Sequence, residues 1–412
     1  MSVRARAAVL GGLAATLLGS AIPAADATPV RADALTSCQR GQTSYVTQTQ
    51  ASNALPMIST PQTWKIATGK GVEVAVVDSG VDVHNQHLTT AVAPGRSLLG
   101  DDGRVDTFGH GTSVAGVIAA RRIPQSVLVG QAPDATLLPF RVYDSAVDST
   151  SGESTAQRPL DPAGVAQGIR WAADAGARVI NVSLSSGPSA TGLGLERAAV
   201  KYAQRKGALI VAATGDSQNG QPVTMKRYPA SFPGVLGVAA ANTTGNVDDY
   251  SIHGSDVDVI APGQKVIVPF YDNGDCLGGE NPQTSYAAGF VSGLAAQLVQ
   301  RFPKDSPEMI AWRIASTAKR ARLSQRDDAS GWGLIQPYAA LTLLADPSRP
   351  GPPMPGAARV AATTEESGLT VAGQRSDRLD PVRREVTWWA LGGVGVAALA
   401  LVLTPLVRRR RG

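Results

Sequence analysis

Short apolar runs alternate with longer amphipathic segments between about residues 60 and 345. The short runs are continuous and rich in β-branched residues, which is typical of strands covered on both faces of a parallel sheet. The longer segments repeat apolar residues at helical spacing. The predicted strands are 72–77, 178–184, 208–213 and 257–260, and the predicted helices are 112–120, 162–175, 194–206, 285–302 and 307–318.

The order of these elements, strand then helix then strand, predicts an α/β domain. Its central sheet should be mainly parallel, with helices on both faces and right-handed crossovers. In open sheets of this kind, binding and catalytic sites lie beyond the carboxyl ends of the strands. Polar residues that directly follow strands are therefore the first candidates for chemistry.

The N-terminal end has the pattern of an export signal. Arg4 and Arg6 precede an apolar run over 7–22, and small residues at 25–27 have the spacing of a cleavage site. This predicts a secretory signal peptide over 1–27. An uncleaved anchor or a buried helix is the alternative.

The C-terminal end has the pattern of a membrane anchor. Residues 388–407 carry no charge, begin with two tryptophans and are followed by four arginines. As a helix they would span roughly 30 Å, the thickness of a bilayer core, with the arginines inside. We predict one transmembrane helix over 388–407, a basic cytoplasmic tail over 408–412, and a Pro-rich, then polar, linker over 346–387. The domain over 60–345 would then be tethered to the cell membrane outside the cytoplasm.

Composition narrows the choice of partners. Hydrophobic residues make up 43% of the chain and charged residues 17%, which excludes a disordered chain. The formal net charge of +5 arises entirely from the two ends, because the first 27 residues contribute +1 and the last arginines +4. The body of the chain has no net positive charge, so electrostatics gives no reason to expect a nucleic-acid partner.

Two cysteines and two neighbouring histidines are candidate ligands or cross-links. In an exported chain, Cys38 and Cys276 indicate one disulfide, which would tie the N-terminal arm over 28–59 to a distant loop. Two free thiols or a partial metal site are the alternatives. His84 and His87 lie three residues apart, but no third ligand cluster accompanies them, so we predict no metal there and no other cofactor. No acidic cluster matches a calcium loop either, which leaves calcium binding open.

Three polar residues follow or precede predicted elements in positions that suit catalysis. Asp78 follows a strand, His110 opens a helix after a polar loop, and Ser285 opens another helix after a Gly-rich loop. A serine hydroxyl becomes a good nucleophile when a neutral imidazole takes its proton and a carboxylate orients that imidazole. Taken singly, each residue has an ordinary alternative as a turn residue or an N-cap.

The sequence around these three residues resembles the catalytic motifs of subtilisin-like serine proteases. The motifs are VVDSGV over 76–81, GHGTSVAG over 109–116 and TSYAA over 284–288, and their order Asp, His, Ser is that of subtilisin. The resemblance implies a subtilisin-like three-layer fold and an endopeptidase. In it, Asp78 would orient, His110 would act as general base and acid, and Ser285 would be the nucleophile. Framework segments also agree, over 179–184, 228–235 and 258–263.

The resemblance also implies where a protein or peptide substrate binds. An extended peptide would lie along two edges, one that follows a predicted strand and one that precedes Gly215. The residues implied in binding are Ser183, Leu184, Ser185, Ser186, Gly187 and Gly215.

The order of segments along the chain resembles that of mycosins, the membrane-anchored subtilases associated with type VII secretion in actinobacteria. Secreted subtilases usually carry a large folded propeptide, whereas only about 30 residues separate the predicted cleavage site from the core here. The implied partners are membrane components of a type VII secretion system. Mycosins typically have more cysteines than this chain, so their disulfide pattern does not transfer in full.

Three positions depart from the family pattern near the nucleophile. Asp216 stands where the family has an oxyanion-donating Asn, and loss of that donor lowers turnover by about 10²–10³-fold. Burial can protonate Asp216, Asn219 can substitute, or another group can compensate; some proprotein-processing subtilases also have Asp at this position. Gln283 replaces a Gly, and Gly289 replaces a Pro, which should loosen the first turn of the helix.

These departures leave two hypotheses. The first is an exported, membrane-tethered serine endopeptidase linked to type VII secretion. The second is a weakly active or inactive subtilase-fold scaffold that stabilises a secretion membrane complex. Labelling with a serine-reactive fluorophosphonate separates them.

Overall fold

The computed structural model describes one compact unit of the chain, within Met1–Ala357. The described residues are 44–48, 51–144, 158, 160–217, 224–247, 250–271, 274–279 and 281–357. No helix among them combines the length and the apolar character needed to cross a membrane. The predicted signal peptide over 1–27, Cys38, Asn219, the predicted helix over 388–407 and the tail over 408–412 lie outside the described residues.

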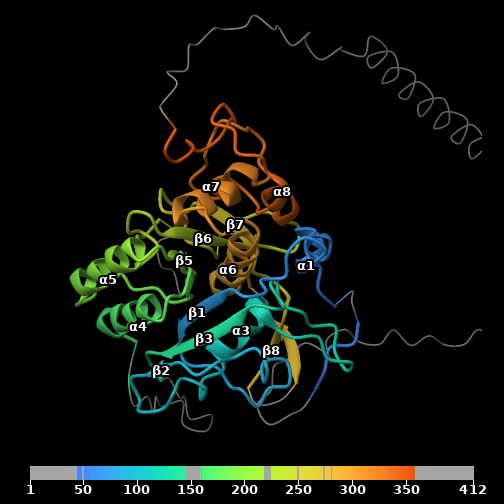
Figure 1. Ribbon diagram of the computed structural model, residues 1–412, viewed down its shortest axis with the longest axis vertical. Coiled ribbons are helices and arrows are strands. Elements are labelled where there is room, and N and C mark those ends of the chain that lie inside the picture. The colour runs from blue at the N-terminus through green and yellow to red at the C-terminus, as the bar shows by residue number, and fades with distance from the viewer. Residues whose placement is uncertain are drawn as a thin grey trace, which may run out of the picture. The chain divides into compact units, whose positions relative to one another are not determined.

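A seven-stranded sheet forms the centre of the fold (Figure 1), in the order β2-β3-β1-β4-β5-β6-β7. All six neighbouring pairs are parallel. The chain adds strands on one side of β1 first and then crosses to β4 on its other side, so the sheet has a switch point between β1 and β4, where sites form in such folds. The strands are β1 (Glu73–Asp78), β2 (Arg96–Ser97), β3 (Thr136–Arg141), β4 (Val179–Val182), β5 (Leu209–Ala213), β6 (Leu236–Ala241) and β7 (Val259–Pro262).

Both faces of this sheet are buried because successive side chains of a strand point to opposite faces. On β1, Val74 and Val76 pack in one core with α3 (His110–Ala119) and α6 (Thr284–Arg301). Ala75 and Val77 pack in a second core with α4 (Pro162–Asp174) and α5 (Leu193–Arg205). This two-sided burial explains why the strands are continuous apolar runs.

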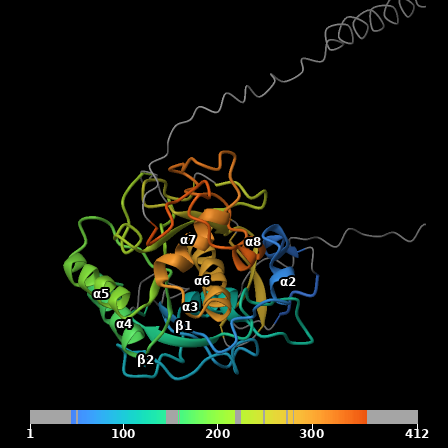
Figure 2. The same cartoon turned by 45° about the horizontal axis from the view of Figure 1, so that its top comes forward.

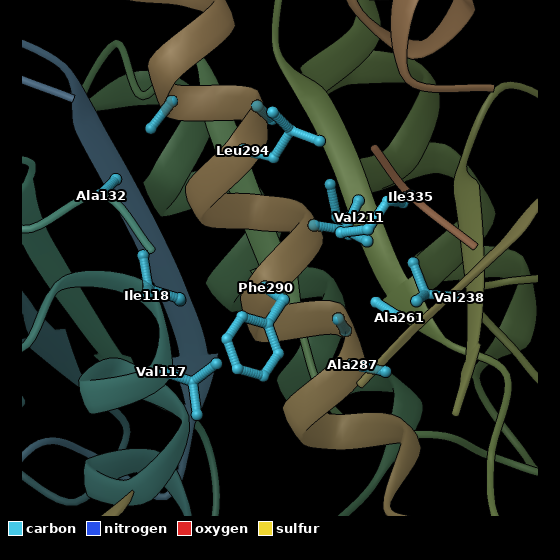
Figure 3. Packing of buried hydrophobic residues seen from close by; sticks show 14 of the residues in the cluster. Val117, Ile118, Ala132, Val211, Val238, Ala261, Ala287, Phe290, Leu294 and Ile335 are labelled. Carbon is cyan, nitrogen blue, oxygen red and sulfur yellow. The ribbon is translucent and has the colours of Figure 1, made fainter. Parts of the chain in front are cut away.

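Helix α6 runs through the larger core. Figure 3 shows its Ala287, Phe290 and Leu294 between residues of α3, such as Val117, and residues of the sheet, such as Val211. The helix is continuous through Gly289, where a Cβ atom would lie 3.0 Å from the Val117 side chain. The glycine expected to loosen α6 therefore has a packing role, since it lets α3 approach closely.

Smaller elements complete the unit. Helix α2 (Thr60–Thr63) packs beside α8 (Pro337–Thr342), as Figure 2 shows. Helix α7 (Pro307–Thr317) follows α6, and α1 (Ala54–Met57) precedes α2. An antiparallel hairpin of β8 (Val266–Pro269) and β9 (Asp275–Gly278) lies outside the main sheet.

The first part of the predicted linker packs against this unit. The Trp312 indole N–H donates to the carbonyl oxygen of Pro352 at 3.1 Å, and Arg349 Nε donates to the carbonyl oxygen of Ser316 at 3.3 Å. The proline-rich stretch up to Ala357 is thus held on α7.

Candidate active site

Asp78 and His110 meet at the carboxyl end of the sheet. Asp78 ends β1 and is fully buried, while His110 is the first residue of α3. His110 Nδ1 lies 2.7 Å from Asp78 Oδ1. Gly111 permits this approach, because a Cβ atom at that position would lie 2.1 Å from the carbonyl oxygen of Gly80.

Ser285 completes the arrangement from a third element. It is the second residue of α6, and its Oγ lies 3.0 Å from His110 Nε2. The structure therefore brings together the three residues that the sequence singled out, from β1, α3 and α6. Their contacts form one continuous path from a buried carboxylate through an imidazole to a hydroxyl, which is the arrangement needed to activate a serine.

The electrostatic surroundings favour the charged form of His110. Burial by itself would lower the pKa of His110, but the adjacent Asp78 carboxylate outweighs it, with smaller contributions from Asp106 and Asp216, so the pKa lies above the ordinary histidine value. The charged imidazolium form of His110 is thus stabilised, and the neutral imidazole is populated at correspondingly higher pH.

Asp106 holds the start of α3, a role that the sequence analysis missed. Its Oδ1 accepts from Ser79 Oγ at 2.9 Å and from the Gly109 N–H at 2.8 Å. Its Oδ2 accepts from the N–H and the hydroxyl of Thr112, at 2.9 and 2.6 Å. Since Ser79 Oγ also accepts from the Gly111 N–H at 3.0 Å, this carboxylate joins the end of β1 to the beginning of the helix that carries His110.

Replacing Asp106 by alanine should damage both folding and turnover. We expect Asp106→Ala to lower the free energy of unfolding by about 2–4 kcal/mol, because buried N–H groups lose their acceptor. We expect kcat to fall by about 10²-fold, since a shift of His110 by about 1 Å is enough for such a loss. Denaturant midpoints and turnover measure the two effects. Asp102→Ala, which removes a half-buried aspartate paired with Arg104, is the control; equal behaviour of the two variants would refute the role.

Asp216 lies beside the nucleophile. It follows β5, and its Oδ1 accepts from the Thr284 N–H at 2.9 Å, one residue before Ser285. Burial raises the pKa of the Asp216 carboxyl above the ordinary value, although the Thr284 hydrogen bond opposes this. The Ser285 N–H, in the first turn of α6, has no acceptor within the helix, so it can donate to a group outside the helix.

The two predicted substrate-binding edges flank Ser285. The segment Ser183 to Gly187 follows β4, and the Ser183 carbonyl oxygen lies 3.2 Å from Ser285 Oγ. Ser186 exchanges two backbone hydrogen bonds with Tyr228, at 2.9 and 3.0 Å. The Leu184 side chain is buried in the core with residues of α4 and α5. It therefore anchors the first edge to the core and does not face the substrate. Ser185 Oγ lies next to Gly215, on the second edge.

The other candidate ligands are apart from this site. His87 is fully buried, with Nε2 3.0 Å from Asp275 Oδ2 and Nδ1 2.8 Å from the carbonyl oxygen of Arg121. His84 is exposed and pairs with Asp82. Within the described ranges no group of three or more His, Cys, Asp or Glu residues is arranged to hold a metal ion. Cys276 is buried in β9, and its pairing with Cys38 stays a prediction.

The parallel α/β fold, with Asp78, His110 and Ser285 together at the carboxyl end of its sheet, is that of a subtilisin-like serine protease. The subtilase family model matches residues 69–333. Mycosin-4 of Mycobacterium tuberculosis is 32% identical over 391 residues, which cover 88% of this chain and 82% of that protein. Thermitase of Thermoactinomyces vulgaris is 36% identical over 242 residues, 58% of this chain and 80% of that protein.

A solved structure agrees with these sequence relatives. The crystal structure of MycP1 from the ESX-1 type VII secretion system is 30% identical, covers 78% of this chain and 92% of that chain, and has a TM-score of 0.62. The chain therefore belongs to the subtilase family and, within it, to the mycosins.

Proposed function

We propose that this protease hydrolyses peptide bonds of a protein substrate through Asp78, His110 and Ser285. The observation that carries the proposal is the hydrogen-bonded path of 2.7 and 3.0 Å through His110. Ser285 Oγ attacks the substrate carbonyl carbon while its proton moves to His110 Nε2. Asp78 stabilises the imidazolium and holds Nδ1 as the donor.

The imidazolium then protonates the leaving amine, the peptide C–N bond breaks, and an acyl ester forms on Ser285. Water attacks the ester with His110 again as base, which releases the acid and restores the hydroxyl. The negative charge on the carbonyl oxygen faces the Ser285 N–H at the positive end of α6. Asp216 is the second candidate donor to this oxygen, and it donates only when protonated.

Fluorophosphonate labelling tests the proposal directly. We expect the purified full-length protein to form one covalent adduct, located at Ser285 by mass spectrometry of the modified peptide. Ser285→Ala should abolish the adduct. The alternative function, a scaffold with little protease activity, is favoured by the carboxylate of Asp216 next to the nucleophile; absence of labelling in folded protein would support it.

The mycosin relationship supports an exported, single-pass membrane protein that serves a type VII secretion system. In this proposal residues 388–407 span the cell membrane, the catalytic unit faces outward, and Cys38 pairs with Cys276 to tie down the N-terminal arm. Membrane components of the secretion system are the proposed partners.

This topology predicts a specific pattern of proteolysis. Protease added outside intact cells should release the catalytic unit by cutting between residues 358 and 385, and leave a tag at the C-terminus protected. Immunoblots against the catalytic unit and against the tag measure the two fragments. A catalytic unit that survives in intact cells but is cut after lysis would refute the topology.

A further inference from the structure

Arg227 lies between the two substrate-binding edges. A Cβ atom built on Gly215 would lie 3.2 Å from Arg227 Cγ and 3.0 Å from Ser185 Oγ. A Cβ atom on Gly187 would have Arg227 Nη1, at 3.9 Å, as its one neighbour within 4 Å. The stem of Arg227 therefore crosses Gly215, and its guanidinium reaches toward Gly187 through space that both glycines leave open.

The backbone fixes this position. Tyr228, the next residue, exchanges two hydrogen bonds with Ser186 of the first edge. On the second edge, the Gly215 carbonyl oxygen accepts from the Ile252 N–H at 3.0 Å. Arg227 thus belongs to a segment that is tied to one edge and packs over the other.

The guanidinium has no anionic partner among the described residues. It forms no ion pair within 4.0 Å and no side-chain hydrogen bond, and its Nε is buried without an acceptor. A buried donor such as this Nε is costly to leave without an acceptor, and a carboxylate is the partner that matches the planar donors of a guanidinium. Asp216 is close enough for the charge of Arg227 to lower the pKa of its carboxyl, but the two side chains form no ion pair within 4.0 Å, and Asp216 Oδ1 accepts from the Thr284 N–H.

The position of Arg227 relative to Ser285 also indicates which substrate side chain would contact it. The carbonyl attacked by Ser285 lies next to the Ser183 carbonyl oxygen and to Asp216, which are the ends of the two edges closest to the nucleophile. If an extended peptide lies along the two edges as the sequence predicts, the side chain of the residue that carries this carbonyl enters the space between them, over Gly215. That is where the Arg227 stem and guanidinium lie.

From these contacts we propose that Arg227 makes this protease select substrates with an acidic residue, Asp or Glu, immediately before the scissile bond. The inference rests on the proposed function, because it assumes that Ser285 attacks the peptide. It adds the chemical class of the substrate side chain, which neither the family motifs nor the relatives specify.

A matched pair of inhibitors tests the selectivity at Ser285 itself. Two peptidyl diphenyl phosphonates, identical except for a Glu or a Gln side chain at the reactive residue, are reacted with the full-length protein in detergent. Titration with a small fluorophosphonate that lacks such a side chain first measures the fraction of protein molecules that have a reactive serine. We expect the Glu compound to inactivate about tenfold to a hundredfold faster than the Gln compound, the range for a hydrogen bond between charged groups.

Variants assign the effect to Arg227. In Arg227→Gln the ratio of the two rates should fall close to one, while Arg205→Gln, which removes an equal charge from the exposed far end of α5, should keep the wild-type ratio. Equal rates for both compounds in wild-type protein that reacts with the fluorophosphonate would overturn the inference alone. A ratio that survives Arg227→Gln would overturn it too. Failure of the fluorophosphonate reaction would overturn the proposed function, and the inference with it.

Discussion

Ser285→Ala is expected to lower kcat by about 10⁶-fold, and His110→Ala by a similar factor, as the equivalent changes do in subtilisin. The double variant should be no worse than either single variant. The reason lies in the geometry: the hydroxyl and the imidazole share one hydrogen bond of 3.0 Å, so removal of either group removes proton transfer and nucleophilic attack together. Turnover of one quenched-fluorescence peptide by all three variants measures this.

The matched control is another serine with a structural role. Ser306 caps α7, where its side chain accepts from the Met309 N–H at 3.3 Å. Ser306→Ala should cost about 1 kcal/mol of stability and leave kcat unchanged. Additive losses in the Ser285 and His110 variants, or more than about 1% residual turnover in Ser285→Ala, would mean that another group performs the attack.

The regular elements were well predicted because their signals are local. Every predicted strand and helix is present, with each end within two residues of its predicted position. The sequence pattern did not predict the short strands β2, β8 and β9, the short helices α1, α2 and α8, or the two longer strands β3 and β6. Strand β3 contains Pro139, which usually argues against an interior strand, and β6 ends in three alanines, which have little strand preference. Tertiary packing between neighbouring strands overrides both signals.

The residues of the candidate site also differ in how far a local sequence signal predicts them. Asp78, His110 and Ser285 were predictable because each lies in a motif of a few residues. Asp106 was not, because its role depends on joining two elements: it accepts from Ser79, 27 residues away at the end of β1, as well as from Gly109 and Thr112 at the start of α3. The position of Arg227 is likewise defined by two glycines that only the folded chain brings near it. Sequence motifs identify the residues proposed to react. Residues that position a catalytic side chain or select a substrate are recognised only from their contacts in the folded chain.

The pH dependence of turnover should reveal the state of Asp216. His110 must be neutral to accept the Ser285 proton, so its contribution to the rate rises as pH increases through its raised pKa. As the proposed oxyanion donor, Asp216 would donate only when protonated, so its contribution would fall as pH increases through its own pKa, which burial has raised. The two requirements oppose each other. Wild-type protein should therefore show a narrow optimum and low turnover.

Asp216→Asn should remove this conflict. A neutral amide donates at every pH, so turnover should increase by about 10²-fold and the alkaline limb of the profile should disappear. The acid limb should move to lower pH, because one of the charges that raise the pKa of His110 is gone. The measurement is turnover against pH for wild type and variant on one peptide.

Two controls decide the assignment. Asp134→Asn removes an equal charge from an exposed position before β3, at the amino end of that strand and thus away from the carboxyl ends where Asp216 lies, and should leave both rate and profile unchanged. Asn219→Ala tests the other candidate donor. If Asp216→Asn has no effect while Asn219→Ala abolishes turnover, Asn219 is the oxyanion donor and Asp216 is not. If Asp216→Asn instead lowers turnover, the hydrogen bond that its carboxylate accepts from Thr284 matters more for positioning Ser285 than any bond it donates to the oxyanion.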